Sequence, residues 1–134
     1  LHDIGKLNVP TTTLNKEGKL TSEEWDQIRR HPADTRRVMV STDLFAPLAD
    51  LAANHHEKLD GSGYPLGLRA EDLSLAERIL AVADIHDALS AERPYRAPMA
   101  QETVATILNE MAEPKLDAEV VAALLETLRE TLAA

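Results

Sequence analysis

The chain has 134 residues and a formal net charge of −9; 44% of its residues are hydrophobic and only 3% are aromatic. This length suits a single domain with one core, and a composition rich in Ala and Leu favours helices over strands. The lack of cysteine excludes disulfides and thiolate metal sites. The acidic balance argues against binding of polymeric nucleic acid, and no apolar run is long enough for a membrane helix. We therefore expect a cytoplasmic all-α domain.

Capping signals and apolar spacing predict five or six helices. Thr21 and Glu24 have the spacing of a capping box, as do Ser74 and Glu77, and Asp117 is suited to cap the last helix. The expected helices cover about residues 22–31, 33–40, 45–56, 75–91, 100–111 and 117–132.

Two segments are expected to lie outside the helices. Residues 58–67 contain three glycines and one proline, which is typical of a loop. A short β-ribbon is a further expectation within residues 7–20. The histidines and aspartates that could carry chemistry lie close to these breaks between helices.

Two adjacent pairs carry potential metal ligands. His2-Asp3 offers an imidazole and a carboxylate that could bridge two ions, although such a pair is often only solvated. His55-His56 precedes the glycine-rich loop, and neighbouring imidazoles can each bind one of two close ions. The simpler interpretation of the second pair is a protonated histidine that stabilises a helix C-terminus.

Asp84 follows the apolar run of residues 79–83, so its carboxylate should be partly buried and should need a cation. The cation could be a metal ion, or it could be the guanidinium of Arg78 or Arg93. Asp87 lies three residues further along, on roughly the same helix face.

His31 precedes Pro32 and would by itself be read as a surface or capping residue, and His86 is expected to be structural. The candidate ligands provide nitrogen and oxygen atoms without sulfur, which suits Mn²⁺, iron or Zn²⁺. Two such ions would activate a bridging hydroxide for phosphoryl displacement. The candidates are His2, Asp3, His31, His55, His56 and Asp84.

The order of these motifs resembles the HD-GYP family of HD-type metal-dependent phosphohydrolases. The resemblance spans about residues 1–98, and the motifs occur in the family's order and spacing. They are His2-Asp3-Ile4-Gly5-Lys6, His31-Pro32, His55-His56-Glu57, Asp60-Gly61-Ser62-Gly63-Tyr64-Pro65, Ala83-Asp84-x-x-Asp87-Ala88-Leu89 and Arg93-Pro94-Tyr95-Arg96.

The resemblance implies an HD-domain helical bundle over residues 1–134, with a glycine-rich GYP loop and two or three divalent ions, iron or manganese. It implies that the six candidates are metal ligands, with Asp3 bridging, and that Lys6 stabilises charge on the scissile phosphate. Four positions would shape or contact the dinucleotide: Tyr64, Asp87, Arg93 and Arg96. Arginine suits phosphate because its donors form a planar fork, whereas Tyr64-Pro65 could also be only a rigid turn.

The implied activity is hydrolysis of cyclic di-GMP to the linear dinucleotide or to GMP. Three alternatives stay open: another cyclic dinucleotide or nucleotide as substrate, a non-catalytic binding module, and an interaction domain that uses residues 100–132. Against the last alternative, the apolar residues of that segment are expected to fill the domain's own core or a homodimer seam. Family members carry a helix before the His-Asp pair, which in some supplies ligands to a third ion. Because this chain begins at Leu1, we expect an N-terminally truncated domain. The resemblance also implies fusion to an upstream receiver or sensor domain.

Overall fold

The structure is a computed structural model that describes residues 1–92 and 97–133, and this part of the chain is helical, without a strand. Six α-helices have five or more residues, which confirms the predicted all-α fold. None of the described helices has the length and apolar character needed to cross a membrane. With η for 3₁₀ helices, the elements are η1 (Ile4–Asn8), α1 (Thr11–Leu14), α2 (Ser22–Arg29), α3 (His31–Val40), η2 (Ala46–Leu48), α4 (Ala49–Ala53), η3 (Ala70–Asp72), α5 (Leu75–Ser90), α6 (Gln101–Met111) and α7 (Ala118–Ala133).

The three predicted helix caps are confirmed. The hydroxyl of Thr21 accepts a hydrogen bond from the backbone of Glu24, whose carboxylate accepts one from the Thr21 amide. Ser74 and Glu77 form the same reciprocal pair at the start of α5. At the start of α7, the carboxylate of Asp117 accepts hydrogen bonds from the backbone amides of Glu119 and Val120. Each cap satisfies backbone donors that have no partner inside the helix.

Two expectations are wrong. Residues 7–20 form no ribbon; the end of η1, the single turn α1 and a loop through Gly18 occupy this segment. The helix expected over residues 45–56 is much shorter, because Pro47 restricts its start to a 3₁₀ turn and α4 ends at Ala53. The side chain of Asn54, which follows α4, donates a 2.6 Å hydrogen bond to Glu77 on α5. The chain therefore turns toward α5 before it reaches the two histidines.

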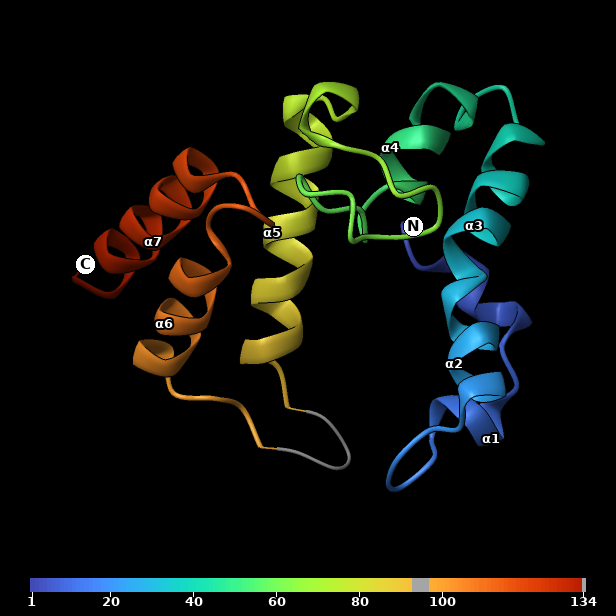
Figure 1. The fold of residues 1–134 in the computed structure, drawn as a ribbon, viewed down its shortest axis with the longest axis horizontal. Coiled ribbons are helices and arrows are strands. Elements are labelled where there is room, and N and C mark those ends of the chain that lie inside the picture. The colour runs from blue at the N-terminus through green and yellow to red at the C-terminus, as the bar shows by residue number, and fades with distance from the viewer. Residues whose placement is uncertain (93–96, 134) are drawn as a thin grey trace.

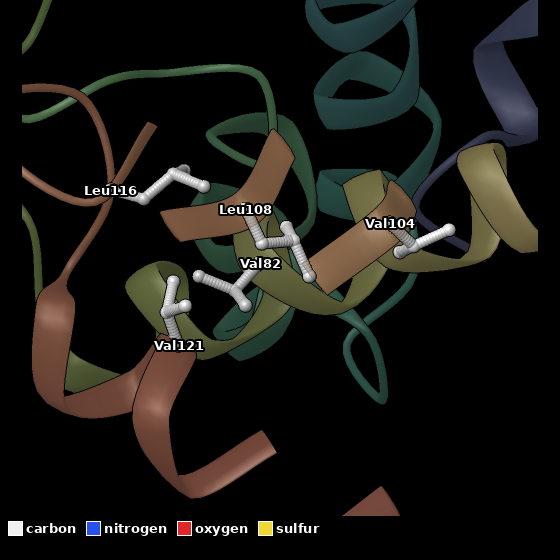
Figure 2. Packing of buried hydrophobic residues seen from close by; sticks show 5 residues of the cluster. All are labelled: Val82, Val104, Leu108, Leu116 and Val121. Atoms are coloured by element: carbon white, nitrogen blue, oxygen red, sulfur yellow. The ribbon is translucent and has the colours of Figure 1, made fainter. Parts of the chain in front are cut away.

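Helix α5 lies in the middle of the molecule (Figure 1). It packs against α4 on one side and against α6 and α7 on the other, and α3 packs against η1 and α4. One buried cluster joins α5, α6 and α7, with side chains that point toward one another (Figure 2): Val82, Val104, Leu108, Leu116 and Val121. Met111, Leu124 and Leu125 pack against this cluster. The apolar face of the last two helices thus fills the domain's own core.

The N-terminal segment is fixed to α3 by close backbone contact. A Cβ atom on Gly5 would overlap the carbonyl oxygen of His31 and the amide of Thr35, so only glycine fits here. The Gly5 amide donates a 3.0 Å hydrogen bond to the hydroxyl of Thr35, which donates in turn to the carbonyl of His2 at 2.9 Å. Because Thr35 is fully buried, this link sets where the His2-Asp3 pair lies.

Candidate metal centre

The structure brings the six predicted ligands together from four parts of the chain. His2 and Asp3 precede η1, His31 is the first residue of α3, His55 and His56 follow α4, and Asp84 lies in the middle of α5. One possible ligand atom from each of Asp3, His31, His55 and His56 lies within 4.8 Å of the others. The carboxylate of Asp84 lies 3.5 Å from His2 Nε2 and 3.7 Å from His56 Nδ1.

The rings of His31 and His55 are oriented as metal ligands require. Their Nδ1 atoms lie 2.6 Å from the carbonyl oxygens of Ile28 and Ala52. A carbonyl can only accept a hydrogen bond, so each Nδ1 carries a proton, and Nε2 is the atom whose lone pair can bind a metal ion. A hydrogen bond of this kind on the second ring nitrogen is the usual support of a metal-bound histidine.

Asp3 provides the clearest test of whether an ion fits. Its Oδ1 atom is buried and has no hydrogen-bond partner among the described residues. The same atom lies 3.2 Å from His31 Nε2 and 3.7 Å from His55 Nε2. A buried carboxylate oxygen beside two imidazole nitrogens is costly unless a cation lies between them. The residues present therefore fit a divalent ion.

The pKa values around Asp3 favour the ligand forms. Burial opposes ionisation of Asp3, but His31, His55 and Lys6 outweigh burial and hold the pKa of this carboxyl well below its usual range. Burial lowers the pKa of His56 to about 3, and the neighbouring His55 and His31 add to this effect. At neutral pH the aspartate is an anion and His56 is neutral, as metal binding requires.

Asp84 is near the histidines and not near an arginine of α5. Arg78 forms a 3.0 Å ion pair with Asp117 instead. The alternative that Arg78 neutralises Asp84 is therefore wrong, whereas Arg93 lies outside the described residues. Asp84 closes the side of the cluster formed by His2 and His56.

The predicted phosphate contact, Lys6, is at the edge of the cluster. Its ammonium lies 2.6 Å from Asp3 Oδ2, on the side of the carboxylate opposite the buried oxygen, and its side chain is 38% exposed. The Lys6 ammonium can therefore reach both Asp3 and a ligand that approaches from solvent.

Two of the four predicted substrate residues, Tyr64 and Asp87, lie in the described part of the chain. The Tyr64 ring centroid lies 4.8 Å from that of His56, and burial raises the pKa of Tyr64 to about 12, so the hydroxyl remains a donor. Asp87 lies on α5 beyond Asp84 and is exposed. Arg93 and Arg96 lie outside the described residues.

One residue that sequence reasoning left without a role organises the loop beside the centre. The Glu57 side chain is only 1% exposed, and its carboxylate accepts hydrogen bonds from the amides of Leu66, Gly67 and Leu68 at 2.6–3.2 Å. The absence of a side chain on Gly63 lets the loop cross directly over the Glu57 backbone. The position of Glu57 in the His55-His56-Glu57 motif was the signal that the sequence offered for this residue. Its role could not be predicted, because the role depends on how the loop of residues 66–68 folds back onto Glu57.

Lys58, the next residue, was also overlooked. Burial lowers the pKa of its ammonium, while attraction by Asp84 and Asp60 opposes this shift. Lys58 therefore adds a positive charge close to the Asp84 side of the cluster, where it can balance the carboxylates.

An all-helical bundle with a His-Asp cluster beneath a glycine-rich loop defines the class of HD-type metal-binding domains. The HD domain family profile matches residues 1–120. The chain therefore belongs to the HD domain family, in its HD-GYP branch.

Three curated relatives illustrate the similarity. A 3'3'-cGAMP-specific phosphodiesterase of Vibrio cholerae is 47% identical over 128 residues, which are 96% of this chain and 28% of the relative. A cyclic di-GMP phosphodiesterase of Pseudomonas aeruginosa is 46% identical over 97 residues, 72% of this chain and 23% of the relative. A cyclic di-GMP phosphodiesterase response regulator of Xanthomonas campestris is 40% identical, over 93% of this chain and 34% of the relative. The chain thus spans about a quarter to a third of the length of these relatives.

Proposed function

We propose that this chain is a metal-dependent phosphodiesterase that opens cyclic di-GMP, with the linear dinucleotide or GMP as product. The observation that carries the proposal is the buried, unpartnered oxygen of Asp3, which lies among imidazoles from two other parts of the chain. A site of this kind binds hard or borderline divalent cations, and the names of the relatives supply the substrate class.

Two or three divalent ions, iron or manganese, would be held by His2, Asp3, His31, His55, His56 and Asp84, with Asp3 as the bridge. Bound ions of this kind would polarise the phosphate oxygens and lower the pKa of water. The protein's part is to fix the imidazoles through their backbone hydrogen bonds and to aim Lys6 at charge that develops on the scissile phosphate.

Substrate contacts form the next part of the proposal. Tyr64 lies against the ligand His56 and keeps its proton, so it can donate a hydrogen bond to the dinucleotide. Asp87, Arg93 and Arg96 are proposed to complete the site, the arginines because their planar fork matches phosphate.

A second substrate has specific support. One of the most similar relatives is described as specific for 3'3'-cGAMP, a cyclic dinucleotide in which one guanine is replaced by adenine. The metal centre acts on the phosphodiester and does not distinguish these two molecules. A direct comparison of their kcat/KM values therefore decides between cyclic di-GMP and 3'3'-cGAMP, and a chain that binds either without cleaving it is a binding module.

We also propose that residues 1–134 act as one cytoplasmic HD-GYP domain within a longer protein. The relatives are three to four times longer than the matched segment, and one of them is described as a response regulator. An upstream receiver or sensor domain and a homodimer would suit such a protein.

The decisive experiment incubates the chain with cyclic di-GMP under anaerobic Fe(II), and in parallel under Mn(II), with chromatographic separation of the products. Asp3→Ala is the inactive blank. Asp43→Ala, which removes an exposed carboxylate between α3 and η2, is the matched control. The linear dinucleotide or GMP should appear with the unmutated chain and the control only. Product from Asp3→Ala, or none from the unmutated chain and from a version extended at its N-terminus, would contradict the proposal.

A further inference from the structure

A row of rings and one guanidinium leads from the metal centre to the only tryptophan of the chain. The Tyr64 ring lies 4.8 Å from the ring of His56. The guanidinium carbon of Arg29, the last residue of α2, lies 5.7 Å from the Tyr64 ring centroid and 5.9 Å from that of Trp25. Both distances are within the range of cation–π attraction. Two rings therefore hold the Arg29 head in place near the cluster.

The donors of Arg29 are open. Although the chain has 23 acidic residues, Arg29 forms no ion pair or side-chain hydrogen bond with any described residue. By contrast, Arg36 and Arg37 each pair with an aspartate. A guanidinium held by stacking, whose planar N–H groups have no partner in the described part of the chain, is prepared to bind a phosphate.

A groove beside this row has room for a ligand. It starts at Lys6, next to Asp3, and extends to Trp25, with Lys16 and Lys19 along its wall. Its volume of about 840 Å³ lies in the range of ligand sites, about 300–1,000 Å³. Trp25 is 47% exposed, so part of its side chain is accessible to a base, and base–aromatic stacking is a common means of holding nucleotides.

We propose that Arg29 and Trp25 form the subsite for the second nucleotide of the substrate. While one phosphate of the cyclic dinucleotide is cleaved at the metal centre, Arg29 binds the other phosphate and Trp25 stacks on the adjacent base. This inference rests on the proposed function and adds a specificity element to it. A substrate with one phosphate and no base reaches only the metal centre and gains nothing from Arg29.

The test compares Arg29→Ala and Arg29→Lys with Arg30→Ala, which removes an exposed positive charge one residue away. Each variant is assayed with cyclic di-GMP and with bis(p-nitrophenyl) phosphate, a small diester with one phosphate. Arg29→Ala should raise KM for cyclic di-GMP about tenfold, the loss expected for one charge-assisted contact, with little change in kcat. Arg29→Lys should have a KM for cyclic di-GMP between those of Arg29→Ala and the unmutated chain. All variants should cleave the small diester equally.

Binding is followed separately through the fluorescence of Trp25, the sole tryptophan. In stopped-flow mixing, cyclic di-GMP should quench the Trp25 fluorescence of the unmutated chain and of Arg30→Ala before turnover. Arg29→Ala should bind cyclic di-GMP more weakly and should need a higher concentration for the same quenching. Equal KM values for Arg29→Ala and Arg30→Ala would overturn the subsite, as would an equal loss on both substrates, which indicates a merely structural Arg29. Unquenched fluorescence during turnover would overturn the role of Trp25. If the unmutated chain cleaves the small diester but neither binds nor cleaves cyclic di-GMP, the proposed substrate fails and the subsite with it; if it cleaves neither diester, the proposed activity itself fails.

Discussion

The Nε2 atoms of His31 and His55 lie 3.4 Å apart, and their lone pairs face each other because both Nδ1 atoms donate to backbone carbonyls. Two lone pairs at this distance repel each other unless a cation lies nearby. The arrangement is stable in a buried position when both nitrogens, together with Asp3, bind an ion. The side-chain geometry thus fits a cation that the chain itself does not supply.

The first prediction follows from this contact. His55→Ala should lower bound iron or manganese severalfold, because it removes one of the nitrogen ligands beside the buried Asp3 oxygen. Metal content after anaerobic loading and gel filtration measures the change. His86→Ala is the matched control, since His86 lies outside the cluster and its ring contacts Ser90. Full metal content in His55→Ala would exclude His55 as a ligand.

Lys6 is expected to act on the reaction and not on metal binding. Among the described residues, its ammonium pairs with the outer oxygen of Asp3 alone, so Lys6→Ala should leave the metal content nearly intact. Removal of one charge that stabilises a transition state lowers kcat about 100-fold. Lys115→Ala, which removes an exposed lysine before α7, should have little effect. Parallel loss of metal and turnover in Lys6→Ala would show that Lys6 instead holds Asp3 in place.

Thr35 is expected to determine where the His-Asp pair lies. Thr35→Val keeps the volume but leaves the Gly5 amide and the His2 carbonyl without their buried partner. The free energy of unfolding should fall by about 1–3 kcal/mol, and metal affinity should fall with it. Urea denaturation is the measurement. Thr127→Val, at an exposed position on α7, should change the free energy by less than about 0.5 kcal/mol.

Glu57 is expected to hold the glycine-rich loop. Glu57→Gln replaces one accepting oxygen with an amide donor that faces the loop N–H groups, so the free energy of unfolding should fall by about 2 kcal/mol. KM should also rise, because Tyr64 lies in the same loop. Thermal unfolding and steady-state kinetics measure both, with exposed Glu71→Gln as control. An unchanged KM in a destabilised Glu57→Gln would separate loop order from substrate binding.

The loss of fold stability at low pH should arise partly from protonation of Glu77. Burial raises the pKa of this carboxyl, but hydrogen bonds from Ser74 and Asn54 outweigh burial and leave it below its ordinary value of 4.5. A group with a lowered pKa in the folded state stabilises the fold above its unfolded pKa, and this contribution disappears as pH falls through the folded value. Glu77→Gln should therefore be less stable than the unmutated chain at pH 7, with the difference shrinking below about pH 4.5.

Urea titrations at pH 7, 5, 4 and 3 test this expectation. Exposed Glu126→Gln is the control and should follow the unmutated chain throughout. A constant difference between Glu77→Gln and the unmutated chain at every pH would show that Glu77 acts through packing and not through its charge.

Sequence reasoning was most reliable where the physics is local. A capping box needs only a hydroxyl and a carboxylate three residues apart, so the starts of α2 and α5 were predictable at Thr21 and Ser74. The helix over residues 45–56 was overestimated because its end depends on a distant partner, the Glu77 carboxylate that holds Asn54.

The sequence by itself determined an all-α domain and the six residues that could hold metal. Helix caps and side-chain chemistry are local properties, and the order of the motifs can be read directly along the chain. Only the tertiary structure decided that these residues meet: the Gly5–Thr35 contact, the turn after α4 and the central position of α5 bring four segments to one point. It also decided the partner of Arg78, the role of Glu57 and the position of Arg29 between Trp25 and Tyr64. These relationships join residues far apart in the chain, and packing alone fixes the distances between them.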